Sequence, residues 1–293
     1  MAPLTTIIFS LLAAAAAAAA AAAVAAPAML IVVAHPDDDC GFGALTYQLT
    51  HNLGARVDLV VVTDGAGGYR YSAVAEFLYN IQLTNETVAR AKLGAIRQKE
   101  EREGASYLGI QDISFLREYD AFTTNCTEAL SWWHVAQIKS ELTAVLDKRR
   151  YDFVLTMLPG TGENHGEHKA ATVLALEVAS QHKSSPVILG GPDLFAYQPL
   201  KDYPITAAPS APTYTLNRTH RFGFRNSLDY RMLVAWAMAA HKSQGSEAME
   251  LPSRGPLAAL EHYWLYNANP RGAAAKARAL FERLDRTPFR YFQ

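Results

Sequence analysis

Residues 29–39 read MLIVVAHPDDD, and this stretch decides the fold class. Its first six residues are apolar throughout, which is typical of a strand buried on both faces of a parallel sheet. Its last five place one histidine and three carboxylates directly after that strand. In parallel α/β sheets, ligands bind outside the carboxyl ends of the strands. The stretch therefore predicts both a central strand and a functional site at its end.

Further apolar runs alternate with amphipathic stretches along the chain. This alternation predicts an α/β protein, a Rossmann-like three-layer fold with a mostly parallel sheet. The region from about residue 186 is less periodic, and we interpret it as a C-terminal elaboration of one domain over 29–293, with two or three more helices. Besides the first strand, the pattern predicts strands at 57–63, 113–116 and 153–158 and helices at 41–53, 86–108, 127–149 and 167–182.

The N-terminus differs from the rest of the chain. MAPLTTIIFSLL is followed by alanines over 13–23 and then by VAAPA. An apolar stretch that ends in small residues predicts a signal peptide over 1–28, and hence a secreted or periplasmic protein with no stable membrane span after processing. The stretch has no Lys or Arg, and the chain is expected to be cytoplasmic if the alanine-rich segment is not a signal.

Composition narrows the possible partners. The 293 residues carry a formal net charge of −1 and contain no basic block, so nucleic acid is not an expected partner. The two cysteines, Cys40 and Cys126, are too few for a disulfide scaffold, and their pairing stays open. The oligomeric state is also left open.

A second polar cluster, ENHGEH at residues 163–168, follows the predicted strand at 153–158. His165 and His168 lie three apart at the start of a predicted helix, a spacing that can bring both rings near one point. Alone, such a pair is more often structural. Three consecutive carboxylates after a neighbouring strand repel one another unless a cation offsets their charge. Together the two clusters predict a metal site at one edge of the sheet.

These two clusters resemble the signatures of one family. AHPDDD at 34–39 is similar to the AHPDDE motif of the N-acetylglucosaminyl deacetylases (PIG-L/LmbE-like proteins), and NHGEH at 164–168 resembles their HxDH motif. Weaker similarities are the TDGAGG loop at 63–68, the segment 97–110, Asp120 and AHKSQ at 240–244. The resemblance covers roughly residues 29–244.

The resemblance implies a role for each residue of the two clusters. His35, Asp38 and His168 would bind Zn²⁺, although Fe²⁺ accepts the same ligands. Asp37 would act as the general base. His165 would stabilise the oxyanion or protonate the leaving amine.

The chain departs from the family motifs at two positions. Asp39 replaces the final Glu of AHPDDE and Glu167 replaces the Asp of HxDH, and both are expected to support the ligands from outside the metal site. Arg97, Asp120 and Arg70 are predicted to contact the sugar. For Arg97, a solvent-exposed charge on the predicted helix is an equally good interpretation.

The resemblance implies a metal-dependent hydrolase that removes the N-acetyl group from an N-acetylglucosamine-type sugar or conjugate. Two alternatives stay open: a sugar-binding homologue without activity, and a zinc amidase acting on a non-sugar acyl-amine. A dinucleotide-binding protein is disfavoured, because GFGALT at 41–46 lacks the third glycine and an acidic loop repels a pyrophosphate. A serine hydrolase is disfavoured because the sequence has no G-x-S-x-G motif.

Overall fold

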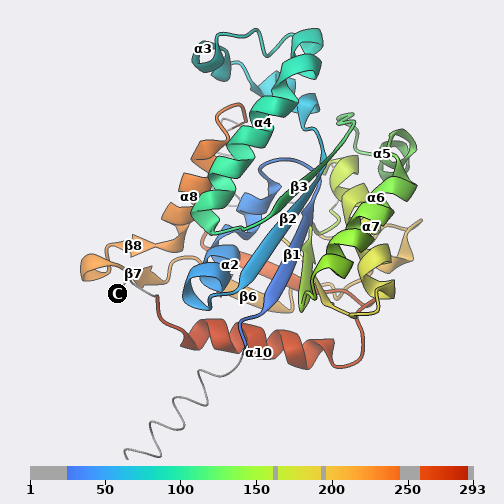
Figure 1. The fold of residues 1–293 in the computed structure, drawn as a ribbon. Coiled ribbons are helices and arrows are strands. Elements are labelled where there is room, and N and C mark those ends of the chain that lie inside the picture. Colours follow the sequence, from blue (N-terminus) through green and yellow to red (C-terminus); the bar gives the residue numbers. More distant parts are fainter. Residues whose placement is uncertain (1–24, 161–163, 193–195, 245–257, 290–293) are drawn as a thin grey trace, which may run out of the picture.

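A seven-stranded sheet forms the centre of the computed structural model, which describes residues 25–160, 164–192, 196–244 and 258–289 (Figure 1). Its order is β3-β2-β1-β4-β5-β9-β6. The first five of these strands run parallel, β9 pairs antiparallel with β5, and β6 pairs antiparallel with β9. The bounds are β1 Ala28–Val33, β2 Arg56–Thr63, β3 Ile113–Glu118, β4 Phe153–Thr156, β5 Val187–Gly190, β6 Tyr214–Asn217 and β9 Leu260–Leu265.

Helices cover both faces of the sheet (Figure 1). The α-helices are α2 Gly43–Tyr47, α3 Ala75–Tyr79, α4 Glu86–Leu108, α5 Cys126–Trp132, α6 Val135–Lys148, α7 Gly166–Gln181, α8 Tyr230–Ala240 and α10 Ala273–Arg286. Short helical turns are η1 Asp38–Phe42, η2 Gln48–Asn52, η3 Ala66–Tyr71, η4 Pro204–Thr206 and η5 Phe224–Asn226, and a small hairpin pairs β7 Arg221–Phe222 with β8 Leu228–Asp229.

Alternate residues of β1 enter two separate cores. Met29, Ile31 and Val33 pack with apolar side chains from α2, α4, α8 and α10. Leu30 and Val32 pack on the other face with side chains from α5, α6 and α7. A strand that is buried on both faces needs apolar residues at every position, which explains the unbroken run at 29–34. The predicted three-layer α/β fold is confirmed.

The long helix α4 has the predicted bounds. Asn85 caps its first turn by accepting a hydrogen bond from the amide of Val88, 3.2 Å away, and Gly109 ends it with a φ of 75°. The helix predicted at 127–149 is instead two helices, α5 and α6. Trp133 adopts an extended backbone between them, and its indole N–H donates to the carbonyl oxygen of Tyr119, 2.9 Å away. This tertiary contact outweighs the local helical pattern.

The C-terminal region corrects a second expectation. The sequence predicted only helices there, and the described part of the region contains two, α8 and α10. The region also adds three strands to the main sheet, β5, β9 and β6. β5 and β6 have four residues each, which is too short for a periodic pattern to reveal them.

A buried carboxylate ties this region to the first helices of the chain. Glu261 on β9 is 1% exposed. Its Oε1 accepts from the amide of Ala44 and from Nε of Arg218, both at 2.8 Å. Its Oε2 accepts from the amide of Leu45 at 3.0 Å and from the hydroxyl of Tyr263 at 2.6 Å. Glu261 therefore holds the start of α2 against the antiparallel part of the sheet.

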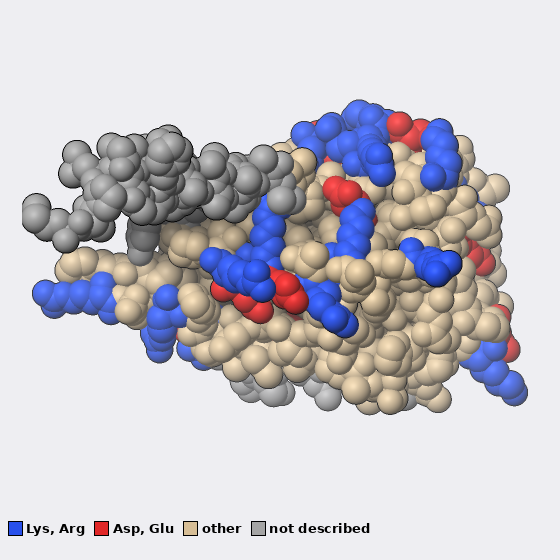
Figure 2. All heavy atoms as spheres, turned by 90° about the horizontal axis from the view of Figure 1, so that it is seen from below, with Lys and Arg blue, Asp and Glu red and all other residues tan. Residues whose placement is uncertain are grey.

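At the other end of the sheet, where the parallel strands begin, charges of opposite sign pair with one another. Lys276 Nζ lies 2.9 Å from an Asp152 oxygen, and Arg56 Nη2 lies 2.6 Å from an Asp112 oxygen. Figure 2 shows Lys and Arg spread over this end of the molecule with Asp and Glu among them.

The predicted signal peptide at 1–28 lies outside the described residues except for its last four. Among the described helices, we find none with the length and apolar character that a membrane span requires.

We expect Glu261→Ala to lower the free energy of unfolding by about 3–5 kcal/mol, because it leaves the buried charge of Arg218 without its carboxylate. Urea unfolding followed by circular dichroism measures the loss. Glu282→Ala is the control: it removes an exposed ion pair with Arg286 and should cost at most about 0.5 kcal/mol. Equal losses of unfolding free energy in the two variants would show that Glu261 does not hold α2 against the antiparallel part of the sheet.

Candidate metal centre

Loops after β1 and β4 bring the two polar clusters together at the carboxyl edge of the sheet, since β1 and β4 are neighbouring parallel strands. The loop after β1 folds back on itself. Oδ2 of Asp38 accepts from the amides of Ala34 at 3.1 Å and His35 at 2.7 Å. Asp37 adopts a φ of 114°, an unfavourable value for a residue other than glycine. The loop therefore holds the side chains of His35 and Asp38 close together.

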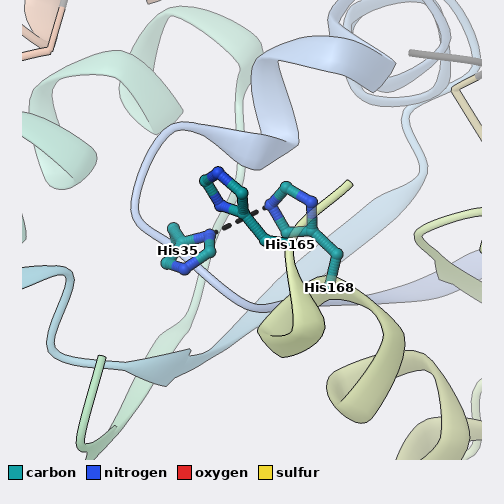
Figure 3. A group of neighbouring side chains, drawn as sticks. All are labelled: His35, His165 and His168. Carbon is teal, nitrogen blue, oxygen red and sulfur yellow. Dashed lines mark hydrogen bonds between the residues drawn. The ribbon is translucent and has the colours of Figure 1, made fainter. Parts of the chain in front are cut away.

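Three histidines converge at this edge, as Figure 3 shows. His35 comes from the loop after β1, and His165 and His168 come from the start of α7. One ring nitrogen of each lies within 4.8 Å of the others, an arrangement that can hold a metal ion. Nδ1 of His35 and Nε2 of His168 are 3.0 Å apart.

The carboxylate of Asp38 lies beside two of these rings. Its Oδ1 is 3.1 Å from Nε2 of His168, and its Oδ2 is 3.6 Å from Nδ1 of His35. Ligands at about 2.0–2.2 Å from a tetrahedral zinc ion stand roughly 3.3–3.5 Å from one another. Two imidazoles and one carboxylate are also a known catalytic zinc set. The donor atoms of His35, Asp38 and His168 therefore fit one divalent ion.

Two further side chains orient the histidine rings from outside. Nε2 of His35 lies 3.5 Å from Oδ1 of Asp120, and Nδ1 of His168 lies 2.8 Å from Oδ1 of Asn164. Such partners fix which ring nitrogen faces a metal. The structure places the carboxylate of Asp120 beside His35. The predicted contact between Asp120 and the sugar stays a prediction. Asn164 was missed, although it stands in the NHGEH motif, because an Asn has no distinctive sequence signal.

The buried charges of this cluster stabilise one another. Burial favours the neutral form of His35, but the charges of Asp120 and Asp38 outweigh it and raise the pKa of His35 well above its usual range. Burial likewise opposes ionisation of Asp38, yet His168 and His35 hold its pKa well below the ordinary value. The carboxylate of Asp38 is therefore ionised.

His165 has a different environment. Burial, with the charges of His168 and His35, lowers the pKa of His165 to about 3. Its ring centroid lies 5.3 Å from that of Phe122, at the outer side of the cluster. Arg70, predicted to contact the sugar, is exposed, and its guanidinium lies over the rings of Phe122 and Tyr69 at 4.8 Å and 4.7 Å. These side chains form the outer rim of the site.

Arg97 on α4 is 3% exposed, so the interpretation as a solvent-exposed helix charge is wrong. Its Nη2 donates to Oδ2 of Asp37 at 2.9 Å and to the carbonyl of Pro36 at 2.5 Å, and its Nη1 donates to the carbonyl of Gly65 at 2.7 Å. One turn further along α4, Glu101 accepts from the amide of Asp37 at 2.9 Å. These contacts hold the loop, while a sugar contact by Arg97 stays a prediction.

Asp39 and Glu167 were expected to support the ligands. Both are fully buried. Oε1 of Glu167 accepts from the amides of Ala121 at 3.1 Å and Thr123 at 3.3 Å, so this side chain fixes the loop that follows Asp120. Burial and the charge of Asp38 raise the pKa of Asp39 to about 7, against hydrogen bonds from its own amide and from the backbone and thiol of Cys40.

We expect Asn164→Ala to weaken metal binding about 10- to 100-fold, because His168 then loses the partner that orients its ring. Competition with a fluorescent zinc chelator measures the affinity. Asn217→Ala, on the edge strand β6, is the control and should bind like the parent. Unchanged affinity in the Asn164 variant would show that Asn164 does not orient His168.

Comparisons with known proteins show what the chain resembles. The family described as "PIG-L: GlcNAc-PI de-N-acetylase" matches residues 30–179. No curated protein sequence gives a match. The chain is similar in structure to the N,N'-diacetylchitobiose deacetylase from Pyrococcus horikoshii, with a TM-score of 0.54, 21% identity and 82% of each chain covered.

Two further solved structures share the fold. An antimicrobial pseudoaglycone deacetylase, Dbv21, has a TM-score of 0.53 and 18% identity, with 84% of this chain and 98% of that chain covered. A zinc-inhibited form of teicoplanin deacetylase has a TM-score of 0.51 and 14% identity, with 81% and 97% covered. At these identities the similarity establishes the fold alone. The family match spans just over half of the chain, and the protein belongs to the PIG-L deacetylase family.

Proposed function

We propose that this protein is a metal-dependent N-deacetylase that removes the acetyl group from an N-acetylglucosamine-type sugar or conjugate. The observation that carries the proposal is the convergence of His35, Asp38 and His168 at ligand spacing, with Asp37 on the same loop. Family membership supports the reaction class. A neighbour named as a diacetylchitobiose deacetylase, and one named as a deacetylase of the teicoplanin biosynthesis pathway, support a sugar-containing substrate.

His35 Nδ1, the Asp38 carboxylate and His168 Nε2 would hold the ion. The donor set suits Zn²⁺ and also accepts Fe²⁺. When bound, such an ion lowers the pKa of a coordinated water towards 7 and polarises the amide carbonyl.

Asp37 is the candidate general base. Its side chain is 20% exposed, so it can reach a water molecule at the site, whereas the ligand Asp38 is 8% exposed. Arg97 fixes one oxygen of the Asp37 carboxylate, and Glu101 fixes its backbone amide. A general base must stand within hydrogen-bond reach of the proton it takes, and these two contacts fix the position of the carboxylate.

His165 is the candidate for stabilising charge on the substrate oxygen. Its pKa of about 3 means that the ring is neutral at physiological pH. A neutral imidazole still carries one N–H, which can donate to the oxyanion of a tetrahedral intermediate. The environment of His165 thus favours hydrogen-bond donation over transfer of a proton to the leaving amine.

The rim of the site combines aromatic rings with a positive charge. The guanidinium of Arg70 lies over the rings of Tyr69 and Phe122, and Phe122 lies beside His165. Aromatic faces pack against the C–H face of a sugar, and a guanidinium donates to its hydroxyl groups. This rim favours a sugar over a simple acyl-amine, which is the alternative substrate class.

Separate variants distinguish metal ligands from the base. We expect Asp38→Ala and His168→Ala to lose the metal, because each removes a ligand. Asp37→Asn should keep it and lose about 10²- to 10⁴-fold in turnover, the usual size of a general-base contribution. Elemental analysis and acetate release measure the two properties. Normal turnover in Asp37→Asn, or full metal occupancy in both ligand variants, would contradict the assignment.

A substrate series tests the proposed substrate class. N,N'-diacetylchitobiose and N-acetylglucosamine conjugates should release acetate, whereas N-acetylated amino acids of similar size should not. Arg70→Ala should raise KM with little change in kcat, because it removes ground-state binding at the rim. Hydrolysis of the amino acids alone would identify a non-sugar amidase, and binding of the sugars without acetate release would identify an inactive homologue.

A further inference from the structure

A second group of potential metal ligands lies behind the loop that follows β1. Asp39 and Cys40 belong to η1, and His241 directly follows α8. One ligand atom from each, a carboxylate oxygen, the thiol sulfur and a ring nitrogen, lies within 4.8 Å of the other two. All three residues are at most 1% exposed. The group is distinct from the three histidines, because it shares no residue with them.

Polar atoms in this group lack hydrogen-bond partners among the described residues. Both ring nitrogens of His241 are buried without one, and so is Oε1 of Glu101. Glu101 is close to the group, since its Oε2 accepts from the amide of Asp37 on the same loop. A buried polar atom without a partner costs about 1–3 kcal/mol, and such atoms are rare in folded proteins. Three of them beside the Asp39 carboxylate and the Cys40 thiol indicate that something else binds there.

Carboxylates surround this group. Asp37, Asp38 and Asp39 follow one another in the loop, and Glu101 accepts from the backbone amide of Asp37 behind it. Arg97 contacts the carboxylate of Asp37, and His35 and His168 contact that of Asp38. A cation bound behind the loop would therefore meet carboxylate oxygens as well as the thiol and the imidazole.

We propose that Asp39, Cys40 and His241 bind a second divalent cation of the zinc type, with Glu101 in the fourth position. Thiolate, imidazole and carboxylate ligands together suit Zn²⁺, and a structural zinc site is normally closed by four protein ligands. Binding releases the proton of the Cys40 thiol. Because the three ligands are buried, the ion enters as the chain folds. Since the site is buried, the ion supports the structure and does not meet substrate.

The position of this ion gives it a definite structural role. It would join η1, which begins at the ligand Asp38, to the end of α8 and to α4. The strained loop that carries Asp37 and Asp38 would then be held from behind by metal bonds as well as by Arg97. The proposal does not depend on the proposed deacetylase function.

Cobalt substitution separates the two sites, because only the proposed site contains sulfur. The Co²⁺-loaded protein should show a thiolate-to-cobalt charge-transfer band in the near ultraviolet. Cys40→Ser and His241→Gln should each lose or shift that band. Cys126→Ser is the matched control, since Cys126 is the other buried free cysteine and lies on α5, outside the group. The control should keep the band, and so should His168→Ala, which disrupts the histidine centre.

Metal content gives the second readout. Protein made in zinc-supplemented medium should carry about two ions per chain, with one lost in Cys40→Ser and the other lost in His168→Ala. A single ion per chain with no thiolate band would overturn the proposal and would mean that protons or water fill the cluster. A band that persists unchanged in Cys40→Ser would also overturn it. Because neither readout is activity, failure here is distinguishable from failure of the proposed function.

Discussion

Negative charge gathered at the end of β1 is the constraint on which the rest of the site depends. Asp37, Asp38 and Asp39 follow one another in a loop whose backbone is strained at Asp37. Such a loop is unfavourable unless cations and hydrogen bonds compensate its charges. Arg97 supplies one positive charge and three hydrogen bonds from α4. His35 and His168 compensate the charge of Asp38 in part, and they stand where a metal ion would add to that compensation.

The order of the strands explains how distant residues meet. β4 lies next to β1, so the loop after β4 and the start of α7 bring His165 and His168 to the loop that carries His35. β2 lies on the other side of β1, and the glycine-rich loop after it approaches Asp120: the amide of Gly67 donates to that carboxylate at 2.9 Å. A side chain at Gly67 would collide with Asp120. The close approach of the Gly67 backbone therefore fixes where the Asp120 carboxylate lies.

Sequence reasoning predicted what depends on local pattern and missed what depends on tertiary contact. The bounds of α4 follow from its cap residues, and the clusters at His35 and His168 follow from polar residues at the ends of apolar strands. The break at Trp133 depends on a bond to Tyr119, and the burial of Arg97 depends on the loop it holds. The short strands β5 and β6 are stabilised by their neighbours in the sheet, so four residues alone carried no signal.

We infer that two loops at one edge of the sheet build a single metal centre from His35, Asp38 and His168. X-ray diffraction from crystals of the zinc-loaded protein, recorded on both sides of the zinc absorption edge, locates the ion. An anomalous peak is expected within bonding distance, about 2.0–2.2 Å, of His35 Nδ1, the Asp38 carboxylate and His168 Nε2. The absence of a peak among these three side chains, in crystals that contain zinc, would contradict it.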